Sequence, residues 1–297
     1  MRTESVDPRF VEIDRWPTAF AVEAMLEGQL AAIASLFSQQ GQLAAAAEAG
    51  AARLLRGGRL VYVGAGTSGR IAVQDGVELF PTYNWPCERA LFVLAGGIAA
   101  LASSVEGAED DRDDAIEQIR AHALTANDVV IGVAASGLTP FTVAAVTEAR
   151  GRGALIIAIS NNAATPLLAQ ADFALLADTG SELIAGSTRM KAGTAQKALL
   201  NVLSTAMMLR CGLVYKGMMV NMRVSNDKLA ARARAIVQQL TGADAATADA
   251  AMAAAEGSIK LAVLIASGVD KPRAAELLAG SGDNLRAALE RSHASEG

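Results

Sequence analysis

Short apolar runs alternate with helical patterns through the middle of the chain. Five such runs, rich in β-branched residues, lie at 59–66, 89–97, 128–136, 154–162 and 173–178. Most of them lack the polar alternation of a strand with one face in water, which is typical of strands buried on both faces. Alternation of strands with helices predicts a parallel sheet with right-handed crossovers. We therefore expect an α/β fold built on a doubly wound, five-stranded parallel sheet.

Helical periodicity accounts for much of the remaining sequence. Two helices are expected ahead of the first strand, at 18–37 and 42–56, and Gly57-Gly58 ends the second. Further helices are expected between and after the strands, at 109–123, 140–152, 189–211 and 226–240.

The sequence beyond residue 240 changes to short, alanine-rich helical stretches. The stretches "TGADAATADAAMAAAEG", "SIKLAVLIASG" and "DKPRAAELLAGSG" predict three short helices separated by glycine. Asp270 can cap the third, with Pro272 in its first turn. The expected organisation is an N-terminal helical segment (1–58), a sheet domain (59–240) and a small helical domain (241–297).

Length and composition restrict the class of protein. A chain of 297 residues, 52% hydrophobic and 19% charged, is typical of a globular protein. The formal net charge of −5 speaks against nonspecific nucleic-acid binding, which needs a basic surface. The start, "MRTESVDPRF", does not resemble a signal peptide, and apolar runs such as "LAVLIA" are much shorter than a membrane span. We expect a soluble cytoplasmic protein that binds neither nucleic acid nor membrane.

Cysteine and histidine are few and scattered. The sequence contains Cys87, Cys211, His122 and His293, without metal-ligand spacing. We expect two reduced thiols and no metal or other cofactor.

The sequence "VYVGAGTSGR" runs from the first strand into a glycine turn and then into a helical pattern. Gly64, Gly66 and Gly69 have the spacing of a dinucleotide-binding loop, but the second strand ends "VLAGG", without the acidic residue that such a site needs. The loop instead carries two hydroxyls, Thr67 and Ser68, at the start of a helix. Backbone N–H groups and the helix dipole favour phosphate or sugar oxygens there.

Two further segments have similar chemistry. Ser136, Gly137 and Thr139 follow the third strand in "AASGLTP", at the sheet edge where α/β proteins bind ligands. Ser187 and Lys191, in "GSTRMKAGTAQK", stand at the start of a later helix, where a cation can pair with an anion. Each segment alone also fits an ordinary capped turn or a solvated basic face. Together they favour a small-anion site.

Four motifs, "VGAGTSGR", "VEGAEDD", "AASGLTP" and "GSTRMKAGTAQK", occur in this order in the N-acetylmuramic acid 6-phosphate etherases. The sequence resembles that family over nearly its whole length, from "TESVDPRFVEIDR" through "NMRVSNDKLAARA" to the tail. The family belongs to the sugar isomerase (SIS) domain superfamily and is related to the glucokinase regulatory proteins. The resemblance implies a SIS fold with a phosphosugar loop in place of a nucleotide loop. It also implies a homodimeric enzyme of cell-wall recycling with its active site at the subunit interface.

The family reaction removes D-lactate from C3 of N-acetylmuramic acid 6-phosphate, giving N-acetylglucosamine 6-phosphate. In the open-chain sugar the C2 proton lies next to an aldehyde. A base can therefore remove it while an acid protonates the departing ether oxygen, and water then adds at C3. The resemblance implies that Glu78, in "DGVELFPT", is the acid and that Glu109, in "EGAEDD", is the base. Neither a metal nor a nucleotide is required.

Without the resemblance, the two glutamates are less distinctive. Glu109 stands in an acidic run that also fits a solvated helix start. Glu78 lies in an apolar segment before Pro81, and partial burial there would raise the pKa of its carboxyl, as a general acid requires. Glu78 follows Ser68 by ten positions, so an unbroken helix would separate them by roughly 15 Å. Either the helix ends early or Glu78 completes a site in a partner subunit.

The sequence departs from the family pattern near these residues. The family usually has Ala-Ser-Glu-Cys-Pro-Pro around the acid, where this chain has "GVELFP", and arginine where Leu138 stands. The loss of that arginine could weaken anion binding or change the accepted substituent. One alternative is therefore an isomerase or lyase acting on a related sugar phosphate. Another is a non-catalytic phosphosugar sensor. Such a sensor usually carries a second SIS domain, for which this chain has no length, or a DNA-binding module, and the sequence shows no basic helix-turn-helix.

Overall fold

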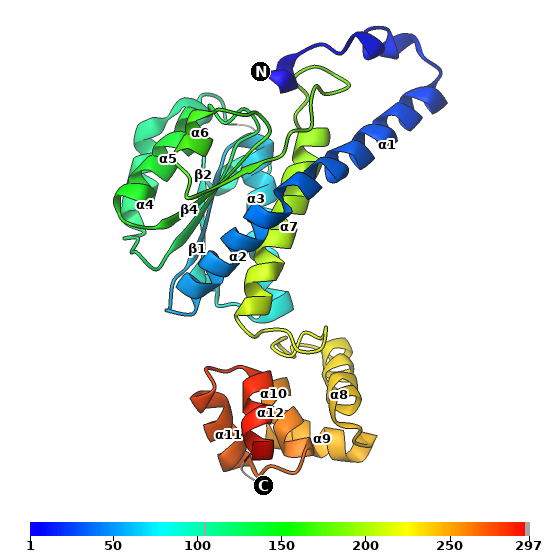
Figure 1. Ribbon diagram of the computed structural model, residues 1–297, viewed down its shortest axis with the longest axis vertical. Coiled ribbons are helices and arrows are strands. Elements are labelled where there is room, and N and C mark those ends of the chain that lie inside the picture. Colours follow the sequence, from blue (N-terminus) through cyan, green and yellow to red (C-terminus); the bar gives the residue numbers. More distant parts are fainter. Residues whose placement is uncertain (104, 295–297) are drawn as a thin grey trace. The chain divides into compact units, whose positions relative to one another are not determined.

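A five-stranded, all-parallel sheet forms the centre of the structure, with helices on both of its faces (Figure 1). The computed structural model describes residues 1–103 and 105–294. The order across the sheet is β2-β1-β3-β4-β5. The strands are β1 (Leu60–Gly64), β2 (Ala90–Leu94), β3 (Val129–Val133), β4 (Leu155–Ser160) and β5 (Phe173–Leu176). Each lies inside one of the apolar runs, so the predicted doubly wound α/β fold is confirmed.

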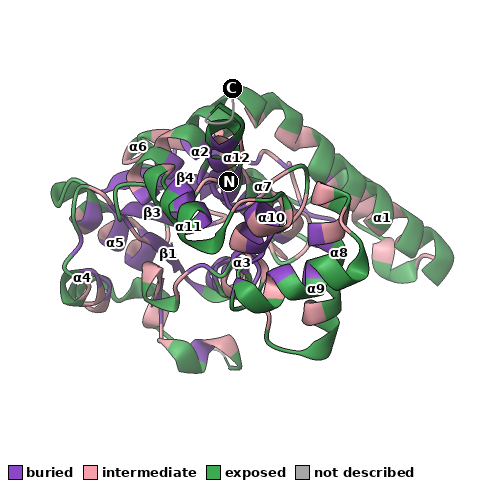
Figure 2. Ribbon diagram, turned by 90° about the horizontal axis from the view of Figure 1, so that it is seen from below, coloured by how far each residue is buried: buried purple, intermediate pink, exposed green. Residues whose placement is uncertain are grey.

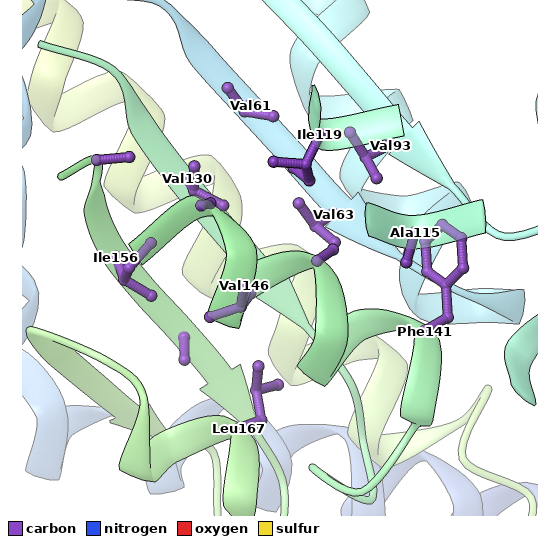
Figure 3. Packing of buried hydrophobic residues seen from close by; sticks show 14 of the residues in the cluster. Val61, Val63, Val93, Ala115, Ile119, Val130, Phe141, Val146, Ile156 and Leu167 are labelled. Carbon is purple, nitrogen blue, oxygen red and sulfur yellow. The ribbon is translucent and has the colours of Figure 1, made fainter. Parts of the chain in front are cut away.

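One face of the sheet packs against α4 (Arg112–Ala121), α5 (Pro140–Gly151) and the short α6 (Pro166–Ala169). Val61 and Val63 of β1 belong to the core cluster on this face, together with Phe141 and Val146 of α5 (Figure 3). All four side chains are fully buried. Strands that are buried in this way explain why the sequence shows continuous apolar runs.

The other face is covered by α2 (Gln40–Leu54), α3 (Gly66–Tyr83) and α7 (Lys191–Arg210) (Figure 1). Tyr62, between Val61 and Val63, points to this side, and its hydroxyl donates to Asp75 Oδ2 of α3 at 2.9 Å. The neighbouring Gly76 allows α3 to approach closely, because a Cβ there would lie 2.5 Å from the ring of Phe92.

A buried carboxylate links β1, α3 and α7. Asp75 is 4% exposed, and its Oδ1 accepts hydrogen bonds from Asn201 Nδ2 at 2.7 Å and Ser204 Oγ at 3.2 Å. Burial, aided by the Asp75 carboxylate, raises the pKa of Tyr62 well above its usual value, so the phenol stays neutral and donates. Hydrogen bonds to a charged carboxylate from two directions fix the rotation of α3 about its axis.

The chain forms two compact units. The first comprises Met1–Val77 and Cys87–Met207 and contains the sheet, and the second comprises Glu78–Pro86 and Met208–Gly297. Helix α3 continues unbroken past the first division.

The C-terminal part of the second unit is all-helical. Asp270 Oδ1 accepts a hydrogen bond from Arg273 N at 3.0 Å and caps α11, as predicted. The sequence pattern predicts three helices in the tail and misses α12, whose buried face consists only of Leu285, Ala288 and Ser292. The helices are α8 (Asp227–Thr241), α9 (Ala245–Ala254), α10 (Ile259–Ala266), α11 (Lys271–Gly280) and α12 (Leu285–Ala294).

An exposed apolar helix stands at the start of the chain. Helix α1 (Thr18–Ser35) is joined to α2 by the 3-10 turn η4 (Leu36–Gln39). The stretch Thr18–Leu54 is long and apolar enough to cross a membrane by length and composition, and 6% of its most apolar window is buried. One helix that meets this criterion is weak evidence for a membrane span, so the expectation of no membrane segment stays a prediction. Most of α1 is exposed in Figure 2, including Phe20, Leu26 and Leu30.

A buried ion pair at the amino edge of the sheet makes stability depend on pH. Asp128, 1% exposed, accepts hydrogen bonds from the Arg59 guanidinium at 2.8 Å and from Thr125 N at 2.7 Å. Burial alone would raise the pKa of Asp128, but the hydrogen bonds from Arg59 and Thr125 together outweigh burial and hold it below its usual value. A carboxyl with a lowered folded pKa stabilises the native state above its unfolded pKa. It loses that contribution as the pH falls through the folded pKa.

We therefore expect Asp128→Asn to lower the free energy of unfolding by about 2–4 kcal/mol at pH 7. The difference from wild type should shrink as the pH falls below about 4. Urea unfolding between pH 7 and pH 3 measures both effects. Asp249→Asn removes an exposed partner of Arg234 and serves as control, with an effect below about 1 kcal/mol. An Asp128→Asn penalty that is independent of pH would contradict this assignment.

Candidate active site

The loops that follow β1 and β3 lie next to each other at the carboxyl edge of the sheet. These neighbouring parallel strands are in register, with Gly64 opposite Val133 at their ends. The first and second predicted phosphosugar loops therefore start side by side, at the edge where open α/β sheets bind ligands.

Glycines fix the first loop. Gly66 has a left-handed φ of +53°, and a Cβ on Gly69 would lie 2.9 Å from the Gly64 carbonyl carbon. Helix α3 consequently starts directly against the end of β1. In its first turn Ser68 is buried and Thr67 is half-buried. Both residues lie at the positive end of the helix dipole, where N–H groups and hydroxyls can donate to an anion.

The second loop is held by residues that follow β4. Gly137 has a φ of +67°, and a Cβ on it would lie 2.3 Å from Thr165 Oγ1. Ser136 Oγ accepts a hydrogen bond from Leu138 N at 3.1 Å, while the Leu138 side chain is 46% exposed. Thr139 is half-buried and precedes α5 without a side-chain cap bond. Ser136 and Thr139 therefore lie on either side of Leu138, an exposed apolar residue.

The N-terminal segment ties the loops after β3, β4 and β5 together. Thr3 is fully buried, and its Oγ1 accepts a hydrogen bond from Asn162 Nδ2 at 3.0 Å. That amide also donates to Ala135 O at 2.9 Å, and Gly186 N donates to Thr3 O at 3.0 Å. The sequence pattern did not single out Thr3, and its only signal is a place in the family-like stretch "TESVDP".

The third predicted segment is engaged within its own chain. The buried Glu182 carboxylate accepts hydrogen bonds from Lys191 N at 3.0 Å and Ala192 N at 2.9 Å, so a carboxylate already lies at the N-terminus of α7. Lys191 Nζ donates to Ser181 O at 2.7 Å, and Ser187 is half-buried. The anion-binding roles of Ser187 and Lys191 stay predictions.

The first and third segments are nevertheless neighbours. A Cβ on Gly193, in the first turn of α7, would lie 3.7 Å from Thr67 Cγ2 and 3.3 Å from Thr188 O. The first turn of α7 therefore lies within van der Waals reach of the first turns of α3. The fold therefore gathers the hydroxyl-rich turns of all three segments at one edge.

Glu109 lies beside the first loop, in the segment that follows β2. It is exposed in the 3-10 turn η7 (Ala108–Asp110), directly before α4. With Gly66 and Arg70 it lines a cavity of about 70 Å³, whose other walls come from Ala65, Ala95, Ala100, Val105 and Ala108. One of the two predicted catalytic glutamates is thus brought to the predicted phosphosugar loop.

Glu78 does not line that cavity. It is exposed on α3, which is unbroken from Gly66 to Tyr83 and passes through Pro81. The early helix end and the partial burial of Glu78 considered from the sequence are therefore wrong. Ten residues of α-helix place Glu78 roughly 15 Å from Ser68 along the axis. A role in the site of a partner subunit stays a prediction.

Arg70 is the charged residue that the sequence pattern missed. It stands in the first loop's own motif, "GTSGR", but a single arginine in a helix is most often a solvated side chain. Within residues 1–103 and 105–294, no group of three His, Cys, Asp or Glu side chains is placed to hold a metal ion. Hydroxyls, backbone N–H groups and the Arg70 guanidinium are among the donors at this edge.

Known proteins resemble this chain over nearly its whole length. The SIS domain family model matches residues 98–206, and the model for the glucokinase regulatory protein N-terminal SIS domain matches residues 42–150. Fold and site thus define a SIS-domain protein.

The N-acetylmuramic acid 6-phosphate etherase of Deinococcus radiodurans is 46% identical over 97% of this chain and 95% of its own length. That of Streptomyces avermitilis is 46% identical over 97% of this chain and 93% of its own length. The chain belongs to the N-acetylmuramic acid 6-phosphate etherase family.

Solved structures share the fold. A protein from Bacteroides fragilis, described as a phosphosugar isomerase involved in capsule formation, superposes with a TM-score of 0.53. The match covers 68% of this chain and 95% of that one at 19% identity, and it shows the fold alone.

The close contact at Gly137 predicts a sharp effect of adding one methyl group. Gly137→Ala is expected to lower the free energy of unfolding by about 2–4 kcal/mol, because left-handed strain adds to the clash with Thr165. Gly180 has a similar φ of +68° with open space around its Cα, so Gly180→Ala should cost only about 1–2 kcal/mol. Denaturant unfolding compares the two variants. Equal penalties would show that backbone strain alone operates at Gly137.

Proposed function

We propose that this protein is a carbon–oxygen lyase that cleaves the D-lactyl ether of N-acetylmuramic acid 6-phosphate, giving N-acetylglucosamine 6-phosphate and D-lactate. The observation that carries the proposal is the place of Glu109 in a cavity bordered by Gly66 of the phosphosugar loop. Family membership at 46% identity supports the same substrate. The proposed enzyme requires no metal or other cofactor.

The proposed reaction has two stages. In the open-chain sugar, the Glu109 carboxylate removes the proton at C2, the C2–C3 double bond forms and the C3–O bond to lactate breaks. Glu78 of a partner subunit donates the proton that the departing lactate oxygen takes up. Water then adds to C3 while a proton returns to C2, so the net change is hydrolysis of the ether. A positioned base and a positioned acid each accelerate such a step by about 10²–10⁴-fold.

The three hydroxyl-rich segments supply the proposed binding surface for the sugar phosphate. Thr67 and Ser68 stand at the start of α3, where the helix dipole favours the dianionic phosphate. Ser136 and Thr139 stand beside them after the neighbouring strand. Ser187 and Lys191 complete the proposed set from the start of α7.

We also propose that the enzyme is a homodimer whose active site takes residues from both copies. Exposed apolar side chains on α1 and η4 support a second copy as the occupant of this face, with Leu30 73% and Phe37 77% exposed. They adjoin a groove of about 450 Å³ between η4, α2 and α7, which is lined almost entirely by apolar side chains. Apolar patches of this kind mark interaction surfaces. Two cysteines outside any disulfide support a cytoplasmic location.

Separate roles for the two glutamates can be tested by proton exchange. Glu109→Gln is expected to abolish both D-lactate release and exchange of the C2 hydrogen with deuterated water, because both need the base. Glu78→Gln should block lactate release while C2 exchange continues, because the acid acts on the leaving oxygen. Each loss of lactate release should be at least about 100-fold. Enzymatic detection of D-lactate and proton NMR measure the two steps.

Glu106→Gln provides the matched control, since Glu106 is an exposed glutamate of the same acidic run and does not line the cavity. It should keep near-normal activity. Near-normal lactate release by either catalytic variant would show that the wrong carboxylate is assigned. Exchange at C2 without lactate release by the wild type would favour an isomerase instead.

Mixing the two inactive variants tests the shared site. If Glu109 and Glu78 of one site come from different subunits, dimers that contain one copy of each variant regain one complete site. After random reassortment of two-fold dimers the mixture should recover about a quarter of the wild-type activity. Sites built from a single chain would recover nothing. The mixture is unfolded and refolded together, and each variant treated alone is the control.

A further inference from the structure

The cavity beside the first loop combines one cation and one anion with small apolar walls. Arg70 and Glu109 are its charged residues, and the remaining lining comes from backbone and from alanine and valine side chains. At about 70 Å³ it has room for a handful of water molecules. That is the scale of a lactyl group and not of a whole sugar phosphate.

Arg70 is held in place at this cavity by the fold. It lies at the start of α3, where the missing side chain of Gly69 allows the helix to pack directly against the end of β1. Its Nε donates to Ala100 O, a wall residue of the cavity, at 2.9 Å. This bond uses one of the five N–H donors of a guanidinium, and the side chain is half-buried. The geometry orients a fork of donors that suits a carboxylate.

The proposed substrate needs such a group. It carries two anions, the phosphate on C6 and the lactyl carboxylate on the C3 oxygen. Glu109 is proposed to act at C2, which is bonded to C3, so the lactyl group must lie close to Glu109. A carboxylate near another carboxylate is unfavourable unless a cation lies between or beside them.

Two of the other cations around this edge are engaged with the protein itself. Lys191 Nζ donates to Ser181 O, and Arg2 forms an ion pair with Asp178 at 2.6 Å. Leu138, in the second loop, is apolar and supplies no cation. Arg70 shares its cavity with Glu109, which none of these residues does.

We propose that Arg70 binds the carboxylate of the D-lactyl group and is the residue by which the site distinguishes muramic from glucosamine 6-phosphates. The inference rests on the proposed etherase function and adds a specificity determinant to it. The same contact holds the lactate while its C3–O bond breaks, so the leaving group stays aligned with the proton donor.

Substrates that differ only in the lactyl group test this assignment. Arg70→Gln is expected to lower kcat/KM for N-acetylmuramic acid 6-phosphate by about 10- to 100-fold, the range for a hydrogen bond to a charged group. The inhibition constant of N-acetylglucosamine 6-phosphate, which lacks the lactyl group, should stay within twofold of wild type. Wild-type enzyme should in turn discriminate against the lactamide analogue, whose carboxylate is an amide, and Arg70→Gln should not. Arg120→Gln, at an exposed ion pair on α4, is the matched control with unchanged kinetics.

Each outcome is informative. Equal weakening of both ligands by Arg70→Gln would mean that Arg70 only tethers Ala100, and it would overturn the inference. Unchanged kinetics of a folded Arg70→Gln would overturn it as well. Arg70→Lys keeps the charge without the fork and should give an intermediate kcat/KM, which separates a carboxylate contact from a folding defect.

If the wild type releases lactate and the kinetics of Arg70→Gln are unchanged, only the role of Arg70 is refuted. Absence of lactate release by wild type would refute the proposed function and this inference together.

Discussion

The rest of the site depends on the close contact between the end of β1 and the start of α3. A Cβ on Gly69 would lie 2.9 Å from the Gly64 carbonyl carbon and 2.3 Å from Leu94 Cδ1, so only glycine lets the helix begin at that point. This contact places the positive end of the α3 dipole, Thr67 and Ser68 at the carboxyl edge of the sheet. It also sets Arg70 beside the wall of the small cavity. The glycine spacing is therefore a packing requirement of the fold, which different ligands can exploit.

The Asp75 network removes the remaining freedom of α3. A helix that is fixed only at its first turn could still rotate or tilt, but Tyr62 on the sheet and Asn201 on α7 both donate to one buried carboxylate. Partially satisfied buried charges are costly, so the three elements hold together or fail together. These polar residues align α3 against the sheet and α7, while the first turn of α3, with Thr67 and Ser68, stays available to a ligand.

The sequence allowed the sheet to be predicted because β-rich apolar runs reflect burial on both faces. The hydroxyl loops could also be predicted, since the carboxyl ends of parallel strands must meet at one edge. Contacts between distant segments could not be predicted: the bonds from Thr3 to Asn162 and Gly186 join segments that no local pattern relates. The same holds for Glu182, which caps α7 across a loop, and for Arg70. From sequence alone, a charged residue in an amphipathic helix is expected to face solvent, because the segment that packs against it is known only from the fold.

The charge distribution at this edge has a consequence for recognition. The donors proposed for the phosphate in the first two loops are neutral hydroxyls and N–H groups, and the exposed Leu138 between Ser136 and Thr139 carries no charge. Neutral donors bind a phosphate dianion with less long-range attraction than a guanidinium would. If the phosphate contributes less, more of the binding free energy must come from the other anionic end of the proposed substrate, at which Arg70 and Glu109 are proposed to act. Binding energy at the lactyl group is used next to the bond that breaks, whereas binding energy at C6 only holds the sugar. The uncharged Leu138 and the guanidinium in the cavity are thus both consistent with the proposal that the substrate is recognised mainly by the group that the reaction removes.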